Sequence, residues 1–199
     1  MNILLATGIY PPEVGGPATY TAGMAAALRK QGHVVRVVAY GDGYPSEADV
    51  MRVSRKGGAV LRYFRYAWHV FCLARKSNLV YAQGPVSEGL PATIGAWFAR
   101  KPLVMKVVGD YAWEMAQQKG EKTLLDEFLQ TKHTGIVRFY ERIERWTVRR
   151  ARFVIVPSRY LAGVVEQWGV PSSQLHVVLN AIETLPPTRG RDEERRAFG

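Results

Sequence analysis

The residues of this chain best suited to binding a phosphate are two adjacent glycines. Gly15 and Gly16 stand directly before a helix-like segment, and glycine lets bare backbone N–H groups at a helix start approach an anion. Glycines also simply end strands, and this is our interpretation of Gly41 and Gly84. For the adjacent pair we favour a phosphate-binding loop, because two glycines before a helix serve such an approach well.

A second group of candidate residues follows an apolar segment in the middle of the chain. Gly109, Asp110, Trp113 and Glu114 fall within six positions. The two carboxylates could act as a base or accept hydrogen bonds from sugar hydroxyls, and the indole could stack on a ring. The structural alternative is that Asp110 caps a helix and Trp113 packs in the core. The sequence favours neither interpretation over the other.

Strand-like and helix-like segments alternate along the chain, and this pattern predicts the scaffold for these residues. An alternation of this kind is typical of a doubly wound, mostly parallel α/β sheet of the Rossmann-like class. Ligands bind to such sheets beyond the carboxyl ends of the strands. The expected strands are 2–6, 34–40, 50–53, 79–82, 103–108, 153–156 and 175–179, and the expected helices are 17–30, 57–76, 90–99, 123–130, 136–150 and 159–168.

The glycine loop differs from the best-known nucleotide-binding motifs. A dinucleotide fingerprint needs a tight G-x-G-x-x-G turn directly after the first strand, but here Pro11 and Pro12 lengthen the loop. Asp42 follows the second strand as a ribose-binding acid would, which is weak evidence by itself. No lysine follows Gly16 in the register of a P-loop. The four histidines show no metal-binding spacing.

The charge of the chain is strongly positive and unevenly distributed. The formal net charge is +10, and no carboxylate occurs between Asp49 and Glu88. Such a surface attracts nucleic acid, anionic lipid headgroups or phosphorylated substrates, although solvated charges that only aid solubility are the simpler explanation. The single Cys72 excludes an internal disulfide and fits a reducing cytoplasm.

Three segments together resemble the N-terminal half of family-four glycosyltransferases. They are Tyr10-Pro-Pro-Glu-Val-Gly-Gly16 with its helix up to Gly32-His-Val34, the run from Val156 through Ser158 to Leu161, and Val178-Leu-Asn180-Ala-Ile182. The resemblance implies a GT-B fold, in which two Rossmann-like domains face each other across a cleft. It also implies transfer of a sugar from a nucleotide-sugar donor with retention of configuration, usually without a metal or other cofactor.

The family resemblance also implies different roles for the two domains. Residues 1–183 would form the acceptor-binding domain, and residues 184–199 would be a linker and the start of a missing C-terminal domain. Gly15 and Gly16 would lie near the donor diphosphate, within a site to which Tyr10, Gly109, Trp113, Ser158 and Asn180 also belong. The isolated chain would then be inactive, because the C-terminal domain holds the nucleotide.

The chain departs from the family pattern at one position of the site. Many members carry a histidine before a glycine at the end of the fifth strand, whereas this sequence has Val108 before Gly109. The resemblance therefore leaves the catalytic group open, and Asp110 or Glu114 could take the place of the histidine.

The acceptor class implied by the resemblance is a carbohydrate or a lipid-linked sugar. Many relatives act at the cytoplasmic face of a membrane, and the basic, aromatic segment 62–76 would suit peripheral contact with anionic lipid. Its apolar stripe could instead be covered by the sheet; the stripe comprises Val60, Phe64, Ala67, Trp68, Phe71 and Ala74.

Two other classes of function compete with the glycosyltransferase interpretation. One is a nicotinamide-dependent Rossmann enzyme, which tight binding of NAD would support. The other is a non-catalytic module that binds polyanions through its basic face. No nucleic-acid-binding motif occurs in the sequence, so we expect no nucleic-acid partner.

Overall fold

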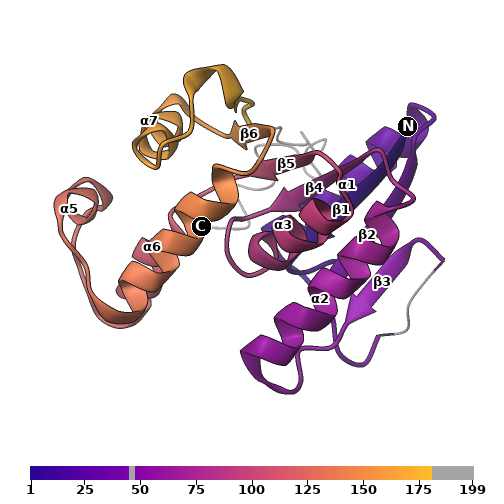
Figure 1. The fold of residues 1–199 in the computed structure, drawn as a ribbon, viewed down its shortest axis with the longest axis horizontal. Coiled ribbons are helices and arrows are strands. Elements are labelled where there is room, and N and C mark those ends of the chain that lie inside the picture. The colour runs from indigo at the N-terminus through magenta and orange to yellow at the C-terminus, as the bar shows by residue number, and fades with distance from the viewer. Residues whose placement is uncertain (45–47, 181–199) are drawn as a thin grey trace, which may run out of the picture.

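A seven-stranded sheet with helices on both faces forms the body of the protein in the computed structural model, which describes residues 1–44 and 48–180 (Figure 1). The strands are β1 (Asn2–Thr7), β2 (Val34–Tyr40), β3 (Val50–Val53), β4 (Leu79–Gln83), β5 (Leu103–Lys106), β6 (Phe153–Val156) and β7 (Leu175–Val177). The helices are α1 (Gly16–Lys30), α2 (Gly58–Ala74), α3 (Gly89–Phe98), α4 (Tyr111–Gln118), α5 (Leu125–Gln130), α6 (Gly135–Val148) and α7 (Arg159–Gln167), and a 3-10 turn, η1, spans Ser172–Gln174.

All six strand pairings are parallel, and the order across the sheet is β3-β2-β1-β4-β5-β6-β7. The chain leaves β1 toward β2 on one side and later returns to β4 on the other side of β1. The order therefore reverses between β1 and β4, where an open α/β sheet offers a crevice for ligands. This topology confirms the predicted doubly wound, Rossmann-like fold.

The two faces of the sheet are covered unequally, as Figure 1 shows. Helix α1 packs on one face, where Ala25 joins a core with Ile3, Leu5 and Val37. Helices α2, α3, α6 and α7 cover the other face over a larger core that includes Leu4, Val80 and Met105. Successive strand residues point to opposite faces, so the apolar runs of β1, β2 and β4 supply both cores.

Local sequence signals account for the ends of several helices. The Ser158 hydroxyl accepts a hydrogen bond from the Leu161 N–H at 3.1 Å, which confirms the predicted cap of α7. Pro17 occupies the first turn of α1, where its missing N–H costs nothing. Gly32 and Gly169 end α1 and α7 with a positive φ, a conformation that side chains disfavour.

Two features differ from the expectations drawn from the sequence. The segment between β5 and α5 contains a helix, α4, that is absent from the expected helices and whose N-cap is Asp110, which confirms the alternative that Asp110 caps a helix. On α2, the side chains packed against the sheet are Tyr66, Val70 and Ala74. Of the predicted stripe only Ala74 is among them, whereas Val60, Phe64 and Trp68 are exposed. The alternative that the sheet covers this stripe is therefore wrong for its large side chains, because periodicity does not say which of two apolar faces of a helix is covered.

Part of the sequence interpretation lies beyond what the structure describes. The linker and helix start expected over residues 184–199, and the last residues of the expected domain up to 183, lie outside the described residues. Within the described ranges, no helix is long and apolar enough to cross a membrane.

Candidate functional site

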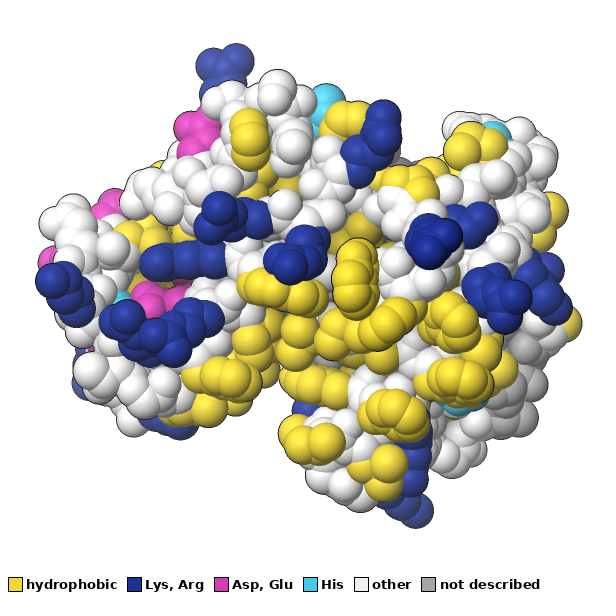
Figure 2. Space-filling model, viewed as in Figure 1, with side chains coloured by type: hydrophobic (Ala, Val, Ile, Leu, Met, Phe, Trp, Pro, Cys, Tyr) yellow, Lys and Arg dark blue, Asp and Glu magenta, His cyan; other side chains and the backbone are white. Residues whose placement is uncertain are grey.

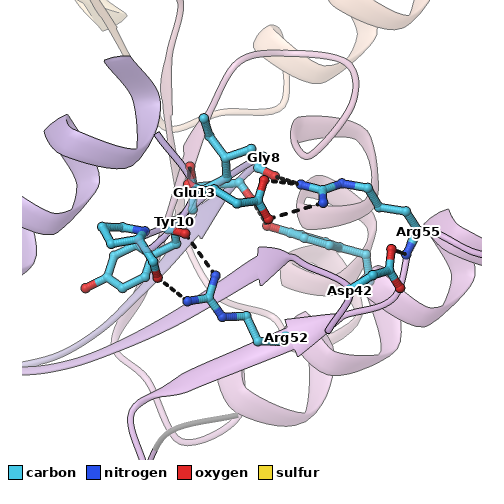
Figure 3. Close-up of polar contacts among 10 residues, drawn as sticks. Gly8, Tyr10, Glu13, Asp42, Arg52 and Arg55 are labelled. Atoms are coloured by element: carbon cyan, nitrogen blue, oxygen red, sulfur yellow. Dashed lines mark hydrogen bonds and ion pairs between the residues drawn. The ribbon is translucent and has the colours of Figure 1, made fainter. Parts of the chain in front are cut away.

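The loop that carries the glycine pair is held in place by two arginines from the segment that begins at β3 (Figure 3). The Arg52 guanidinium donates hydrogen bonds to the backbone oxygens of Tyr10 (3.1 Å) and Pro11. The Arg55 guanidinium forms a bidentate ion pair with Glu13, at 2.8 and 3.2 Å. The positive net charge of residues 50–87 thus has a local structural use that composition alone did not reveal.

We expect Arg55→Ala to lower the free energy of unfolding of this chain by about 1 kcal/mol, because the ion pair with Glu13 is only partly shielded from solvent. Urea denaturation would measure the change. Lys56→Ala, at an exposed neighbouring position, should leave the midpoint unchanged. Equal midpoints for the two variants would contradict an anchoring role for Arg55.

A cavity of about 590 Å³ opens at the carboxyl ends of β1, β4 and β5, at the point where the strand order reverses. Gly16 and Asn180 both line it, so the structure brings together two candidates that are far apart in the sequence. Gly15 is the N-cap of α1, next to this cavity lining. The full lining is Gly16, Pro17, Thr19, Tyr20, Gln83, Gly84, Glu88, Lys106, Val108 and Asn180.

Two polar side chains at the ends of neighbouring strands give the cavity its chemistry. Gln83 and Lys106 are register partners on β4 and β5, and both are buried. The Lys106 ammonium lies 3.3 Å from the centre of the Tyr20 ring and donates to Asn180 Oδ1 at 2.8 Å. Gln83 Nε2 is buried without a hydrogen-bond partner among the described residues. A buried donor without a partner is costly, which suits a ligand with oxygen acceptors.

Glu88 adds a titratable group to the same cavity. Its carboxyl group is buried, and the Ser87 hydroxyl donates a hydrogen bond to it at 2.7 Å. Burial raises the pKa of Glu88 to about 7. A Cβ on Gly84 would lie 2.8 Å from this carboxyl group and one on Gly8 would lie 3.3 Å from it, so both glycines make room for it.

The predicted catalytic carboxylates lie beside the cavity rather than in its lining. Asp110 is buried as the N-cap of α4 and accepts a hydrogen bond from Trp113 N at 2.8 Å. Burial raises the pKa of Asp110, and burial together with the charge of Asp110 raises that of Glu114. The oxygens of Glu144 accept from the backbone N–H groups of Tyr111 and Ala112. The structure thus gives Asp110 a capping contact, and a catalytic role for it or Glu114 stays a prediction.

Four other predicted site residues also lie outside the cavity lining. The Trp113 indole donates to the Thr123 backbone oxygen at 3.0 Å and packs beside Phe128. Ser158 caps α7, and the carbonyl of Tyr10 accepts from Arg52. A Cβ on Gly109 would meet the Glu114 carboxylate, the movable end of that side chain. These placements favour structural contacts for the four residues in this chain.

Sequence reasoning missed the residues that give the cavity its polarity, namely Gln83, Glu88 and Lys106. One signal was available, because Lys106 interrupts an apolar strand and Gln83 ends another. A polar residue in a buried strand is unusual, and strand alternation places both side chains on the face that α1 covers. Glu88 carried no comparable signal in the sequence, because its burial depends on how α3 meets β1 and β4.

The family model described as "Glycosyl transferase 4-like domain" matches residues 15–181, which include the glycine pair, both arginine anchors and the whole cavity lining. The chain belongs to this family. The match confirms the resemblance drawn from the three sequence segments. No curated protein sequence is significantly similar to the chain.

Solved structures with the same fold are proteins about twice as long as this chain. A putative UDP-N-acetylglucosamine 2-epimerase from Listeria monocytogenes has a TM-score of 0.62 at 12% identity, over 88% of this chain and 44% of that one. Anabaena HepE, solved in complex with UDP and glucose, has a TM-score of 0.61 at 18% identity, over 100% of this chain and 50% of that one. The UDP-GlcNAc 2-epimerase of Neisseria meningitidis, bound to UDP-GlcNAc, has a TM-score of 0.62 at 11% identity, over 89% of this chain and 45% of that one. The chain thus has the fold of one half of these GT-B-type enzymes.

Proposed function

We propose that this chain is the acceptor-side domain of a retaining glycosyltransferase that uses a nucleotide-sugar donor. The observation that carries the proposal is the cavity at the strand-order reversal. There the start of α1 at Gly16, the Lys106 ammonium and the unpartnered Gln83 amide converge. A helix N-terminus and a lysine together suit a diphosphate, and an amide beside a carboxyl group suits sugar hydroxyls.

In this proposal the charged diphosphate and the uncharged acceptor sugar occupy different sides of the cavity. The diphosphate of a donor, held by the C-terminal domain, contacts the N–H groups at Gly16 and the Lys106 ammonium. The acceptor sugar occupies the side of Gln83 and Glu88, where a carboxyl group with a pKa of about 7 can donate or accept a hydrogen bond. Glu114, whose carboxylate is more exposed than that of Asp110, is the better placed of the two to contact a substrate.

The nicotinamide alternative receives no support from the residues after β2. Asp42, the candidate ribose-binding acid, accepts hydrogen bonds from the Ser54 hydroxyl at 2.6 Å and the Arg55 backbone N–H at 3.1 Å. These contacts lower the pKa of Asp42, and the residue does not line the cavity. Among residues 1–44 and 48–180 no group of three His, Cys, Asp or Glu side chains is arranged to hold a metal ion. Catalysis without a metal or other cofactor stays a prediction.

A transfer assay with the full-length protein tests the proposal. Release of nucleoside diphosphate from a panel of nucleotide sugars should depend on an added carbohydrate or lipid-linked acceptor, and NMR of the product should show the donor's anomeric configuration. Inversion would overturn the retaining mechanism. Interconversion of nucleotide sugars without an acceptor would overturn the transferase assignment.

The role given to Lys106 makes a separate prediction. Lys106→Met keeps most of the buried side-chain volume but removes the charge, so kcat/KM should fall about tenfold to a hundredfold, as expected for one hydrogen bond to a charged group. Lys30→Met, at the exposed end of α1 and outside the cavity lining, is the control. If Lys106→Met had wild-type kinetics, Lys106 would not contact the substrate.

A further inference from the structure

A second group of polar and aromatic side chains lies near the carboxyl edge of the sheet, on the side that α2 and α6 cover. Arg62 and Tyr63 stand in the second turn of α2, Tyr111 begins α4, and Tyr140 lies in the first half of α6. The Tyr111 and Tyr140 rings meet edge to face, with their centres 5.2 Å apart. We name these four residues the tyrosine–arginine cluster.

A chain of contacts joins this cluster to Glu88 at the edge of the cavity. The Arg62 guanidinium lies 5.6 Å from the centre of the Tyr40 ring, and the Tyr40 hydroxyl donates to the Ser87 backbone oxygen at 2.9 Å. Ser87 in turn donates its hydroxyl to Glu88. Burial raises the pKa of Tyr63, and the nearby Glu88 carboxyl group adds to the rise. The cluster therefore continues the cavity across the edge of the sheet, toward α2 and α6.

Arg62 is a half-buried cation without a counter-charge. Among residues 1–44 and 48–180, its Nε is buried without a hydrogen-bond partner and its guanidinium joins no ion pair. The guanidinium instead lies against two rings, 5.6 Å from the centre of Tyr40 and 5.2 Å from that of Tyr63. A ligand that covers Arg62 removes more of its water, which is unfavourable unless the ligand brings an opposite charge. The position therefore suits a ligand with an anionic group.

The tyrosines of the cluster offer rings and unused hydroxyls to the same ligand. Within the described part of the chain, the hydroxyls of Tyr111 and Tyr140 form no hydrogen bond, and both reach the surface. Burial raises the pKa of Tyr111 to about 12, so its hydroxyl is a neutral donor at pH 7. Rings with free polar ends suit a hydroxyl-rich sugar. Figure 2 shows the surface indented between α6 and the start of α2, with yellow side chains, the colour that includes tyrosine, on both sides.

We propose that the tyrosine–arginine cluster is an acceptor subsite for an acidic sugar, one that carries a carboxylate or a phosphate. Arg62 pairs with the acid, and the tyrosines hold the ring and its hydroxyls. The donor diphosphate does not account for Arg62, because Gly16 lies at the start of α1 and Arg62 lies on α2, across the sheet (Figure 1). The name acceptor subsite rests on the proposed function, but preference for an acidic sugar is a property of binding alone.

Binding of matched sugars to this chain tests the proposal. NMR titrations with methyl glucuronide, methyl glucoside 6-phosphate and methyl glucoside should give a dissociation constant at least about tenfold lower for a charged sugar than for the neutral one. This is the scale of hydrogen bonds to a charged group. The charged sugar that binds more tightly identifies the acid as a carboxylate or a phosphate. Arg62→Met should lose the preference and keep most of the weaker binding of methyl glucoside.

Three further variants separate the charge of Arg62 from general effects. Arg75→Met, at the other end of α2, alters an arginine that lies 5.7 Å from the centre of the Phe71 ring, and should keep the preference. Arg62→Lys keeps a charge without the planar fork and should keep only part of it. Tyr140→Phe should weaken charged and neutral sugars alike, roughly threefold to tenfold, through one lost neutral hydrogen bond. Circular dichroism checks that each variant is folded.

Equal dissociation constants for charged and neutral sugars in the wild type would overturn the proposal. A preference that Arg62→Met retains in full would also overturn it, and loss of that preference in Lys106→Met would assign the acid to the donor cavity. An active transferase that binds charged and neutral sugars equally would contradict the subsite and leave the proposed function intact. A protein that shows the expected preference but transfers no sugar would contradict the proposed function alone.

Discussion

In the full-length protein, Gly16→Trp should lower kcat/KM on the order of a hundredfold or more, the scale of losing a backbone donor that stabilises developing charge. The indole would fill the cavity at the start of α1 and keep a diphosphate away from the helix N–H groups. The fold should survive, because a Cβ at Gly16 meets no heavy atom within 4 Å. Steady-state kinetics with the best donor, together with circular dichroism, would measure both parts of the prediction.

Helix α1 itself provides the control for this substitution. Gly23 also has open space around an added Cβ, is exposed and does not line the cavity. Gly23→Trp should therefore keep wild-type kinetics and a similar melting temperature. Wild-type activity in Gly16→Trp would show that the glycine pair does not bind the donor.

The second large effect concerns the pH dependence of stability. Burial raises the pKa of Glu88 from its usual 4.5 to about 7, so the folded state holds a proton that the unfolded chain releases as the pH rises through this window. The contribution of Glu88 to stability is therefore fully present below pH 4.5 and falls until about pH 7. Across that window the loss amounts to about 3 kcal/mol.

Glu88→Gln removes this titration, since glutamine keeps the shape and carries no charge at any pH. Relative to the wild type, the free energy of unfolding of the variant should rise by about 3 kcal/mol between pH 4 and pH 8. Urea denaturation at a series of pH values measures the difference. The contributions of buried Asp110 and Glu144 to the pH dependence cancel in this difference, because both proteins contain them. Glu127→Gln, at an exposed position of α5, should show no such trend. A pH-independent difference for Glu88→Gln would mean that Glu88 is ionised in the fold.

The sequence was sufficient for the scaffold because each strand carries its own signal. The apolar runs of β1, β2 and β6 and the cap at Ser158 are local features, and all of them appear in the structure where they were expected. Helix α4 was foreseen only as the alternative in which Asp110 caps a helix, because its residues lack a strong apolar stripe. Its start depends on Glu144, a residue of α6 that accepts two backbone N–H groups there.

The site was harder to predict because its residues come from four separate strand ends. Gly16 was found from the glycine pair before a helix and Asn180 through the family resemblance, and the structure places both on one cavity. Lys106 and Gln83 become partners only through the register of β4 and β5, which no single segment encodes. The exposed side of α2 follows the same logic, since only the packing of Tyr66 and Val70 on the sheet decides which apolar residues of this helix remain exposed.

The arginine anchors have a consequence for the thermodynamics of ligand binding. Arg52 and Arg55 fix the carbonyls and the carboxylate of the glycine loop before any ligand is present. Ordering a flexible loop of this length would otherwise cost conformational entropy at the moment of binding. The chain therefore incurs that cost when it folds, so under the proposed function a phosphate at Gly16 would find its backbone donors already oriented. Calorimetry of donor binding should accordingly show a smaller entropic penalty in the wild type than in Arg55→Ala.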